Sequence, residues 1–240
     1  QGYRVVAWDQ LGTGRSERPT DPALWTIERY ARELEQVRTG LDLGAVHLLG
    51  QSWGGWLAIE YALTFNAGVK TLIVSNTAGD LPHLVEELNR LRSALGPETV
   101  TMMLKREAEG SIDHPEYNAA VELLNWRHVN RLETMPPALQ RSMDGMVFDI
   151  YNAMQGPNEF VYIGNLKDWN RVPDMHRITQ PAYIIVGEHD ELTPACAMKM
   201  HHALPNSTLR VFKDASHSTC FETPEPYYRE LLSFLEAHHG

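Results

Sequence analysis

One short segment in the first third of the chain constrains the fold more than any other. Residues 45–49 form an apolar run of strand length, residues 50–55 read Gly-Gln-Ser-Trp-Gly-Gly, and an apolar helical stripe follows between residues 57 and 65. A strand, a turn and a helix in immediate succession require a very sharp reversal of the chain. We expect Gly50 and Gly54 to make room for this turn because neither carries a Cβ.

The same alternation of strand and helix extends through the first 79 residues. Residues 3–8 are predicted to form a buried strand, a helix is predicted to begin after Thr26 as its N-cap, and residues 69–74 predict a further strand. Strands that alternate with helices indicate a parallel sheet with right-handed crossover connections. The sequence therefore predicts an α/β fold.

The pattern changes after residue 79. Charged, Met-rich helical stretches such as 84–95 and 117–132 contain no convincing strand, whereas residues 181–186 and 208–212 restore the strand pattern. The predicted division is 1–79 for the first part of an α/β core, 80–168 for an inserted helical cap, and 169–240 for the second part of the core.

Composition excludes several classes of function. The chain carries 31 Asp and Glu against 21 Lys and Arg, a formal charge of −10, and it has no basic run, so we expect no nucleic-acid partner. No apolar run approaches the roughly 20 residues that cross a bilayer, so we expect no membrane partner. Cys196 and Cys220 lack C-x-x-C spacing and suit a reducing compartment. Because no signal peptide is evident, the expected location is cytoplasmic.

The turn at residues 50–55 has the G-x-S-x-G pattern of a nucleophile elbow, in which a serine hydroxyl is raised above the sheet edge. Ser52 is therefore the candidate nucleophile. The N-terminus of the following helix directs backbone N–H groups toward the same point, and the N–H of Trp53 is the expected oxyanion donor.

A serine nucleophile needs a base and an acid that orients it, and α/β sheets with this turn supply them after later strands. Asp190 follows one of the later predicted strands and His217 follows the next, so they are the predicted acid and base. His189 is a weaker rival as the base. Glu188 and Asp214 remain alternatives as the orienting acid.

No metal and no other cofactor is expected. His201 and His202 are adjacent and therefore point to different faces of a helix, and the chain has no H-E-x-x-H motif. A Ser–His–Asp triad performs acyl transfer without a cofactor.

Beyond the triad, several segments resemble the proline iminopeptidase family of α/β hydrolases, in particular its tricorn-interacting aminopeptidase type. The resemblance covers essentially the whole chain and is carried by residues 9–16, 50–55, 156–160, 166–169 and 187–194. It implies the α/β-hydrolase fold: a mostly parallel sheet with helices on both faces and an inserted helical cap. It also implies that Glu159 in the cap and Glu191 beside the acid hold the free α-amino group of the substrate.

The resemblance has one departure. The family carries a His-Gly-Gly-Pro-Gly type loop before the strand that begins here at Tyr3, and its backbone supplies a second oxyanion donor. Nothing in this sequence corresponds to that loop. We therefore expect the N-terminal strands of the fold to be absent from this chain, which would then be an N-terminally truncated form of a longer protein.

The predicted function is a serine aminopeptidase that removes the N-terminal residue from short peptides through an acyl-enzyme. Its expected partners are short peptides or amino-acid amides with a free N-terminus, and the resemblance implies a small residue such as proline at the cleaved position. Two alternatives stay open. One is an amidase or esterase that acts on amino-acid amides or esters with the same triad, and the other is a non-catalytic ligand-binding homologue.

Overall fold

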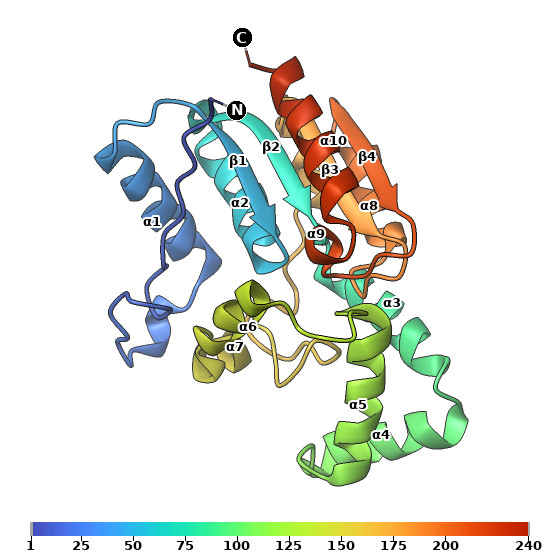
Figure 1. Cartoon of the computed structure of the whole chain (residues 1–240). Coiled ribbons are helices and arrows are strands. Elements are labelled where there is room, and N and C mark those ends of the chain that lie inside the picture. The colour runs from blue at the N-terminus through green and yellow to red at the C-terminus, as the bar shows by residue number, and fades with distance from the viewer. Residues whose placement is uncertain (1, 240) are drawn as a thin grey trace.

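The computed structural model describes residues 2–239, which contain one four-stranded sheet (Figure 1). Its strands are β1 (Val46–Gln51), β2 (Val69–Ser75), β3 (Ala182–Gly187) and β4 (Ser207–Phe212). They lie in the order β1-β2-β3-β4 and every neighbouring pair is parallel. The predicted parallel sheet is confirmed.

The register of the sheet aligns the carboxyl ends of its strands. Gln51, the last residue of β1, pairs with Ser75, the last residue of β2, and Ser75 in turn pairs with Ile185 of β3. The residues that follow these strands therefore emerge at the same edge of the sheet. In open α/β sheets this edge is where ligands bind.

The strand predicted at residues 3–8 is wrong. This segment has no regular secondary structure and pairs with none of the strands within residues 2–239. Trp8 anchors it through a side-chain hydrogen bond from Nε1 to Glu33 Oε1 (3.1 Å), while Val5 is 88% exposed. An apolar run becomes a strand only when a neighbouring backbone satisfies its N–H and C=O groups, and sequence pattern does not reveal that neighbour.

Helices cover both faces of the sheet, as predicted. Leu72 and Val74 of β2 belong to one apolar cluster with α1, α2 and α8, whereas Ile73 between them packs in a second cluster with α10. This alternation follows from the two-residue period of a strand. The helices are α1 (Ile27–Gly40), α2 (Trp53–Thr64), α8 (Pro194–Ala203), α9 (Thr219–Glu222) and α10 (Pro224–Ala237). Short 3₁₀ turns are η1 (Pro22–Leu24), η2 (Asn66–Gly68) and η3 (Val172–Arg177).

Five helices lie between β2 and β3, and α4 to α7 lie beyond the carboxyl ends of the strands in Figure 1. They are α3 (Leu81–Ser93), α4 (Pro97–Glu109), α5 (Pro115–His128), α6 (Pro137–Asp144) and α7 (Phe148–Met154). The helix predicted over 117–132 ends earlier, at His128. Within residues 2–239, no helix is long and apolar enough to cross a bilayer.

The two ends of this helical insertion are joined. Asp80 and Asn170 form an isolated antiparallel bridge, and the N–H of Leu81 donates to the carbonyl of Trp169 at 3.0 Å. The chain therefore leaves the sheet layer and returns to it at one place. We keep 1–79, 80–168 and 169–240 as the proposed division of the chain.

A buried ion pair connects α2 with the segment that follows the insertion. Glu60 is 6% exposed, and its carboxylate accepts hydrogen bonds from Arg171 Nε (2.6 Å), Arg171 Nη2 (3.2 Å) and Trp169 Nε1 (3.1 Å). These donors compensate the desolvation of the carboxylate.

Replacing Arg171 by Met should therefore destabilise the fold, because Glu60 would stay buried without its cation. Breaking a fully buried pair costs about 3–5 kcal/mol, and the partial exposure of Arg171 reduces our expectation to about 2 kcal/mol in the free energy of unfolding, measured by urea titration. Arg177→Met is the matched control, since Arg177 is exposed and its ion pair with the half-buried Asp174 spans 3.8 Å. Equal stability of the two variants would contradict this role.

Candidate active site

Ser52 occupies the junction of β1 and α2 with a strained backbone. Its φ is 54° and its ψ is −123°, a conformation that L-residues rarely adopt. Its N–H donates to the carbonyls of Ser75 (3.0 Å) and Asn76 (3.1 Å), and its own carbonyl accepts from Thr77 Oγ1 (2.9 Å). These contacts to the end of β2 hold the strained turn in place.

The prediction for the two glycines around Ser52 is confirmed for Gly50 and wrong for Gly54. A Cβ on Gly50 would lie 2.0 Å from the carbonyl oxygen of Gly54, so this position needs glycine. The same expectation for Gly54 is wrong, because a Cβ there would meet no described atom within 4 Å. Gly55 instead lies against Thr77, whose side-chain atoms would be 2.5–2.6 Å from an added Cβ.

Trp53 is the first residue of α2, where backbone N–H groups have no acceptor within the helix. Its side chain is held in place, since Nε1 donates to Gln10 Oε1 at 3.1 Å and the indole packs edge-on against Tyr30 and Trp56. The role of the Trp53 N–H as an oxyanion donor stays a prediction.

The structure brings Asp190 and His217 together. Asp190 lies in the loop after β3 and His217 in the loop after β4, and His217 Nδ1 is 3.0 Å from Asp190 Oδ1. The same carboxylate oxygen accepts the N–H of Leu192 at 3.0 Å. Both members of the pair are buried. Because a carboxylate only accepts hydrogen bonds, Nδ1 carries a proton, and Nε2 has a free lone pair in the neutral form of His217.

The alternative acids occupy another position. Glu188 is exposed, and its Oε2 accepts the backbone N–H of Asp214 at 3.0 Å. His189, the weaker rival base, has Nε2 4.0 Å from Glu188 Oε2. The hydrogen bond to His217 therefore favours Asp190 as the orienting acid.

Ser52 and His217 are not joined by a hydrogen bond in the described part of the chain. The amide of Gln51 lies at His217 instead, with its Nε2 3.2 Å from His217 Nε2. This amide lies against the nitrogen of His217 that would accept the Ser52 proton. Catalytic hydrogen bonds are often long or absent without substrate, so we expect the Ser52 hydroxyl to replace Gln51 during the reaction.

Glu191 is a buried carboxylate without a donor. Its side chain is fully buried, Oε1 lies 3.3 Å from His217 Nδ1, and neither oxygen accepts a hydrogen bond from any described residue. Burial raises the pKa of Glu191 well above its ordinary value. Burial lowers the pKa of His217, but the charges of Glu191 and Asp190 outweigh it and raise that pKa. Glu191 and His217 therefore compete for one proton.

Glu159 approaches the same cluster from the segment that follows α7. Its Oε2 accepts from Gln155 Nε2 at 2.9 Å, and Gln155 also donates to the hydroxyl of Tyr151 at 2.6 Å. The charge of Glu159 contributes to the raised pKa of both Glu191 and His217. The two predicted amino-group anchors thus lie in one electrostatic cluster with the predicted base.

The loop that carries His217 is also attached to the end of α5. The N–H of His217 donates to the carbonyl of His128 (3.0 Å), and the N–H of Ser218 donates to the carbonyl of Val129 (3.0 Å). His128 Nδ1 lies 2.8 Å from the carbonyl of His189, next to Asp190. Sequence reasoning missed these contacts because nothing local links the end of a cap helix with a distant loop.

Sequence reasoning also missed Asn76, which follows β2. Its Nδ2 lies 2.7 Å from Asp190 Oδ2, so it contacts the predicted acid directly. One signal was available. Residues 75–77 read Ser-Asn-Thr at the carboxyl end of a buried strand, the place where polar side chains of a site are expected.

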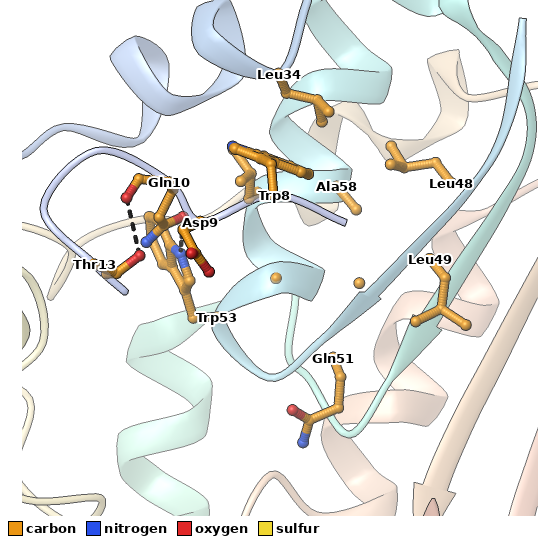
Figure 2. A pocket seen from close by; sticks show the side chains of 13 residues that line it. Trp8, Asp9, Gln10, Thr13, Leu34, Leu48, Leu49, Gln51, Trp53 and Ala58 are labelled. Carbon is orange, nitrogen blue, oxygen red and sulfur yellow. Dashed lines mark hydrogen bonds between the residues drawn. The ribbon is translucent and has the colours of Figure 1, made fainter. Parts of the chain in front are cut away.

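A hollow of about 300 Å³ lies beside the turn of Ser52, between β1 and the segment at residues 8–13. Figure 2 shows Trp8, Gln10 and Trp53 grouped on one side of it and Leu49 on the other. Its lining includes neither Ser52 nor His217 nor the two glutamates. We therefore do not assign it as the place where a substrate reacts.

Within residues 2–239, two groups of side chains could hold a cation. Asp190, Glu191 and His217 bring ligand atoms within 4.8 Å of one another, and so do Glu188, His189 and Asp214 on the surface. In the first group the hydrogen bond to Asp190 already uses His217 Nδ1. That the protein works without a metal or other cofactor stays a prediction.

Comparisons with known proteins show the family and the fold of this chain. Residues 1–224 match the model of the alpha/beta hydrolase fold family. The chain is 37% identical to a proline iminopeptidase of Heyndrickxia coagulans, over 97% of this chain and 81% of that protein, and 36% identical to one of Saccharolobus solfataricus, over 98% and 76%. The crystal structure of proline iminopeptidase from Mycobacterium smegmatis superposes with a TM-score of 0.88 at 33% identity, over 95% of this chain and 78% of that one.

The turn at Ser52 supports a direct test with two glycine variants. Gly50→Ala should lower the thermal midpoint and abolish labelling of Ser52 by a fluorophosphonate probe, because overpacking against the Gly54 carbonyl costs about 1–3 kcal/mol and displaces the turn. Gly54→Ala should keep labelling within about twofold, because its Cβ has open space. Loss of labelling in both variants, or in neither, would contradict the steric interpretation.

Proposed function

Because this chain belongs to the proline iminopeptidase family of α/β hydrolases, we propose that it removes the N-terminal residue, proline above all, from short peptides through an acyl-enzyme. The predicted family and the predicted α/β-hydrolase fold are both confirmed, and the chain is a hydrolase. The site residues and the mechanism below are our proposal.

The observation that carries the proposal is the state of Glu191. A fully buried carboxylate with no hydrogen-bond donor to either oxygen has lost its hydration, and the charge of His217 offsets that loss only in part. The α-ammonium of a peptide supplies both the missing donors and the opposite charge. Since α-amino groups have a pKa near 7.7–8.0, most of the substrate is cationic at neutral pH.

Glu159 supplies the second carboxylate for the same group. It comes from the helical insertion rather than from the core, and Gln155 holds it through the hydrogen bond at 2.9 Å. Two carboxylates at the amino end of the substrate define how far a peptide can enter. This limit explains removal of one residue rather than cleavage within a chain.

The triad then performs acyl transfer. Ser52 Oγ attacks the carbonyl carbon of the first residue while His217 Nε2 takes the hydroxyl proton. Asp190 accepts the Nδ1–H of His217, which fixes the tautomer and stabilises the imidazolium. His217 returns the proton to the leaving amine, and the C–N bond breaks.

Water completes the cycle by the same route. His217 removes a proton from water, the hydroxide adds to the acyl carbon, and Ser52 leaves with the proton returned to its oxygen. The N–H of Trp53 at the start of α2 supports the negative charge on the carbonyl oxygen in both steps.

A pair of arylamide substrates tests the function. Proline p-nitroanilide should be hydrolysed with a kcat/KM at least about 100-fold above that of its N-acetyl derivative, since acetylation removes the charge that two carboxylates bind. Ser52→Ala should lose the activity in the same continuous absorbance assay.

The outcomes separate the alternatives. Equal rates on the two arylamides would contradict the amino-group anchors and favour an amidase or esterase. Activity retained by Ser52→Ala would contradict the proposed nucleophile. A folded chain that hydrolyses neither arylamide and leaves Ser52 unlabelled by fluorophosphonate would favour a binding role.

The pH dependence tests Glu191 without a substrate amine. His217 must be neutral to accept the Ser52 proton, and an ionised Glu191 favours its charged form and raises its pKa. Glu191→Gln removes that charge, so the acidic limb of the fluorophosphonate labelling rate should move to lower pH. Glu188→Gln in the same loop is exposed and should leave the limb in place. An unmoved limb in Glu191→Gln would contradict the contact.

A further inference from the structure

We propose that Asn76 is the positioning residue that aligns the three members of the triad. The proposal rests on Ser52, Asp190 and His217 being the triad of the proposed function, and it adds a residue that connects all three of their loops.

The place of Asn76 in the sheet explains why it reaches all of them. It is the first residue after β2, and β2 lies between β1, which ends before Ser52, and β3, which ends before Asp190. Its N–H donates to the carbonyl of Ile185 in β3 at 2.7 Å, and its carbonyl accepts the N–H of Ser52 at 3.1 Å. The backbone of Asn76 thus ties the strand before the acid to the nucleophile turn.

The side chain reaches the acid and the loop of the base. Asn76 Nδ2 lies 2.7 Å from Asp190 Oδ2, 2.8 Å from Thr219 Oγ1 and 3.2 Å from the carbonyl oxygen of Ser216. Ser216 precedes His217 in the loop after β4, and Thr219 is the first residue of α9, just after that loop. Because the carboxylate and the carbonyl only accept hydrogen bonds, the amide nitrogen must face them, and this settles the orientation of the amide.

The opposite end of the amide is held as well. Asn76 Oδ1 accepts the hydroxyl of Ser75 at 2.7 Å, and the oxygen of Ser75 accepts the hydroxyl of Tyr227 in α10 at 3.2 Å. Asn76 is 1% exposed, so its side chain is shielded from bulk solvent. A fully satisfied buried network of this kind holds its members in one arrangement.

This arrangement determines how Asp190 presents itself to His217. Asn76 occupies Oδ2, so Oδ1 is the oxygen left for His217 Nδ1 and for the N–H of Leu192. The plane of the carboxylate, and with it the plane of the imidazole, follows from these three donors. Displacing reacting groups by about 1 Å can cost roughly 100-fold in rate.

The backbone of Asn76 restricts which side chains can serve. Its φ is 52°, in the left-handed region that Gly, Asn and Asp tolerate best. Glycine keeps this backbone and loses the amide. Aspartate keeps the backbone and the shape, but it exchanges two N–H donors for a second carboxylate against Asp190.

The charges around His217 give the expected direction for the aspartate variant. Asp190, Glu191 and Glu159 already favour its protonated form, and Gln51 at Nε2 is neutral. A carboxylate at position 76 adds negative charge beside Asp190 and raises the pKa of His217 further. The acidic limb of activity should therefore move to higher pH.

The experiment compares Asn76→Gly and Asn76→Asp with Asn118→Asp, an exposed residue of α5 that undergoes the same change of charge. On proline p-nitroanilide, Asn76→Gly should lower kcat roughly 10- to 100-fold and leave KM within about twofold, because the amino-group anchors are untouched. Asn76→Asp should also move the acidic limb of the fluorophosphonate labelling rate to higher pH. Asn118→Asp should match the parent protein in every readout.

If Asn76 had a purely structural role, its variants would have a lower thermal midpoint. Their kcat per labelled active site and the acidic limb of their labelling rate would be unchanged. That result in either folded variant overturns the proposal. If the parent protein fails to hydrolyse proline p-nitroanilide, the proposed function fails, while the labelling rates of Ser52 still decide whether Asn76 positions the triad. If Asn76→Gly does not fold, the kcat and the acidic limb of the isosteric Asn76→Asp variant decide between the two roles.

Discussion

The parallel pairing of β2 between β1 and β3 is the constraint on which the rest of the structure depends. Because Gln51, Ser75 and Ile185 lie in one register, the chain leaves each strand at the same edge and places Ser52, Asn76 and the loop of Asp190 side by side. The hydrogen bonds from the N–H of Ser52 to the end of β2 then hold a backbone conformation that Ser52 would not keep alone.

Electrostatics follow from this geometry. The sheet edge and the helical insertion bury a base beside Asp190 and Glu191 and bring Glu159 near them, so negative charge accumulates where water is excluded. Such a cluster is costly in the absence of a cation. In the proposed function, a substrate that carries an ammonium group relieves that cost on entry, which links binding energy to a free N-terminus.

The strands of the sheet, the turn at Ser52 and the order of the proposed triad could be predicted from the sequence. The strands at 46–51, 69–75, 182–187 and 207–212 have apolar runs bounded by turn residues, and the turn at Ser52 has a steric signature that local pattern reveals. The order of Ser52, Asp190 and His217 followed from the strands that precede them. The features that were predicted wrongly or missed depend on neighbours that are distant in sequence. Residues 3–8 have the composition of a strand without a described partner, Gly54 differs from Gly55 only through Thr77, and Asn76 matters through loops more than 100 residues away.

The attachment of the His217 loop to α5 has a consequence for how the helical insertion can move. The carbonyls of His128 and Val129 accept the N–H groups of His217 and Ser218, so any displacement of α5 that breaks these bonds also releases the base. If a peptide enters by such a displacement, the proposed base loses these two backbone contacts until the insertion returns, so entry and cleavage would need different arrangements of α5.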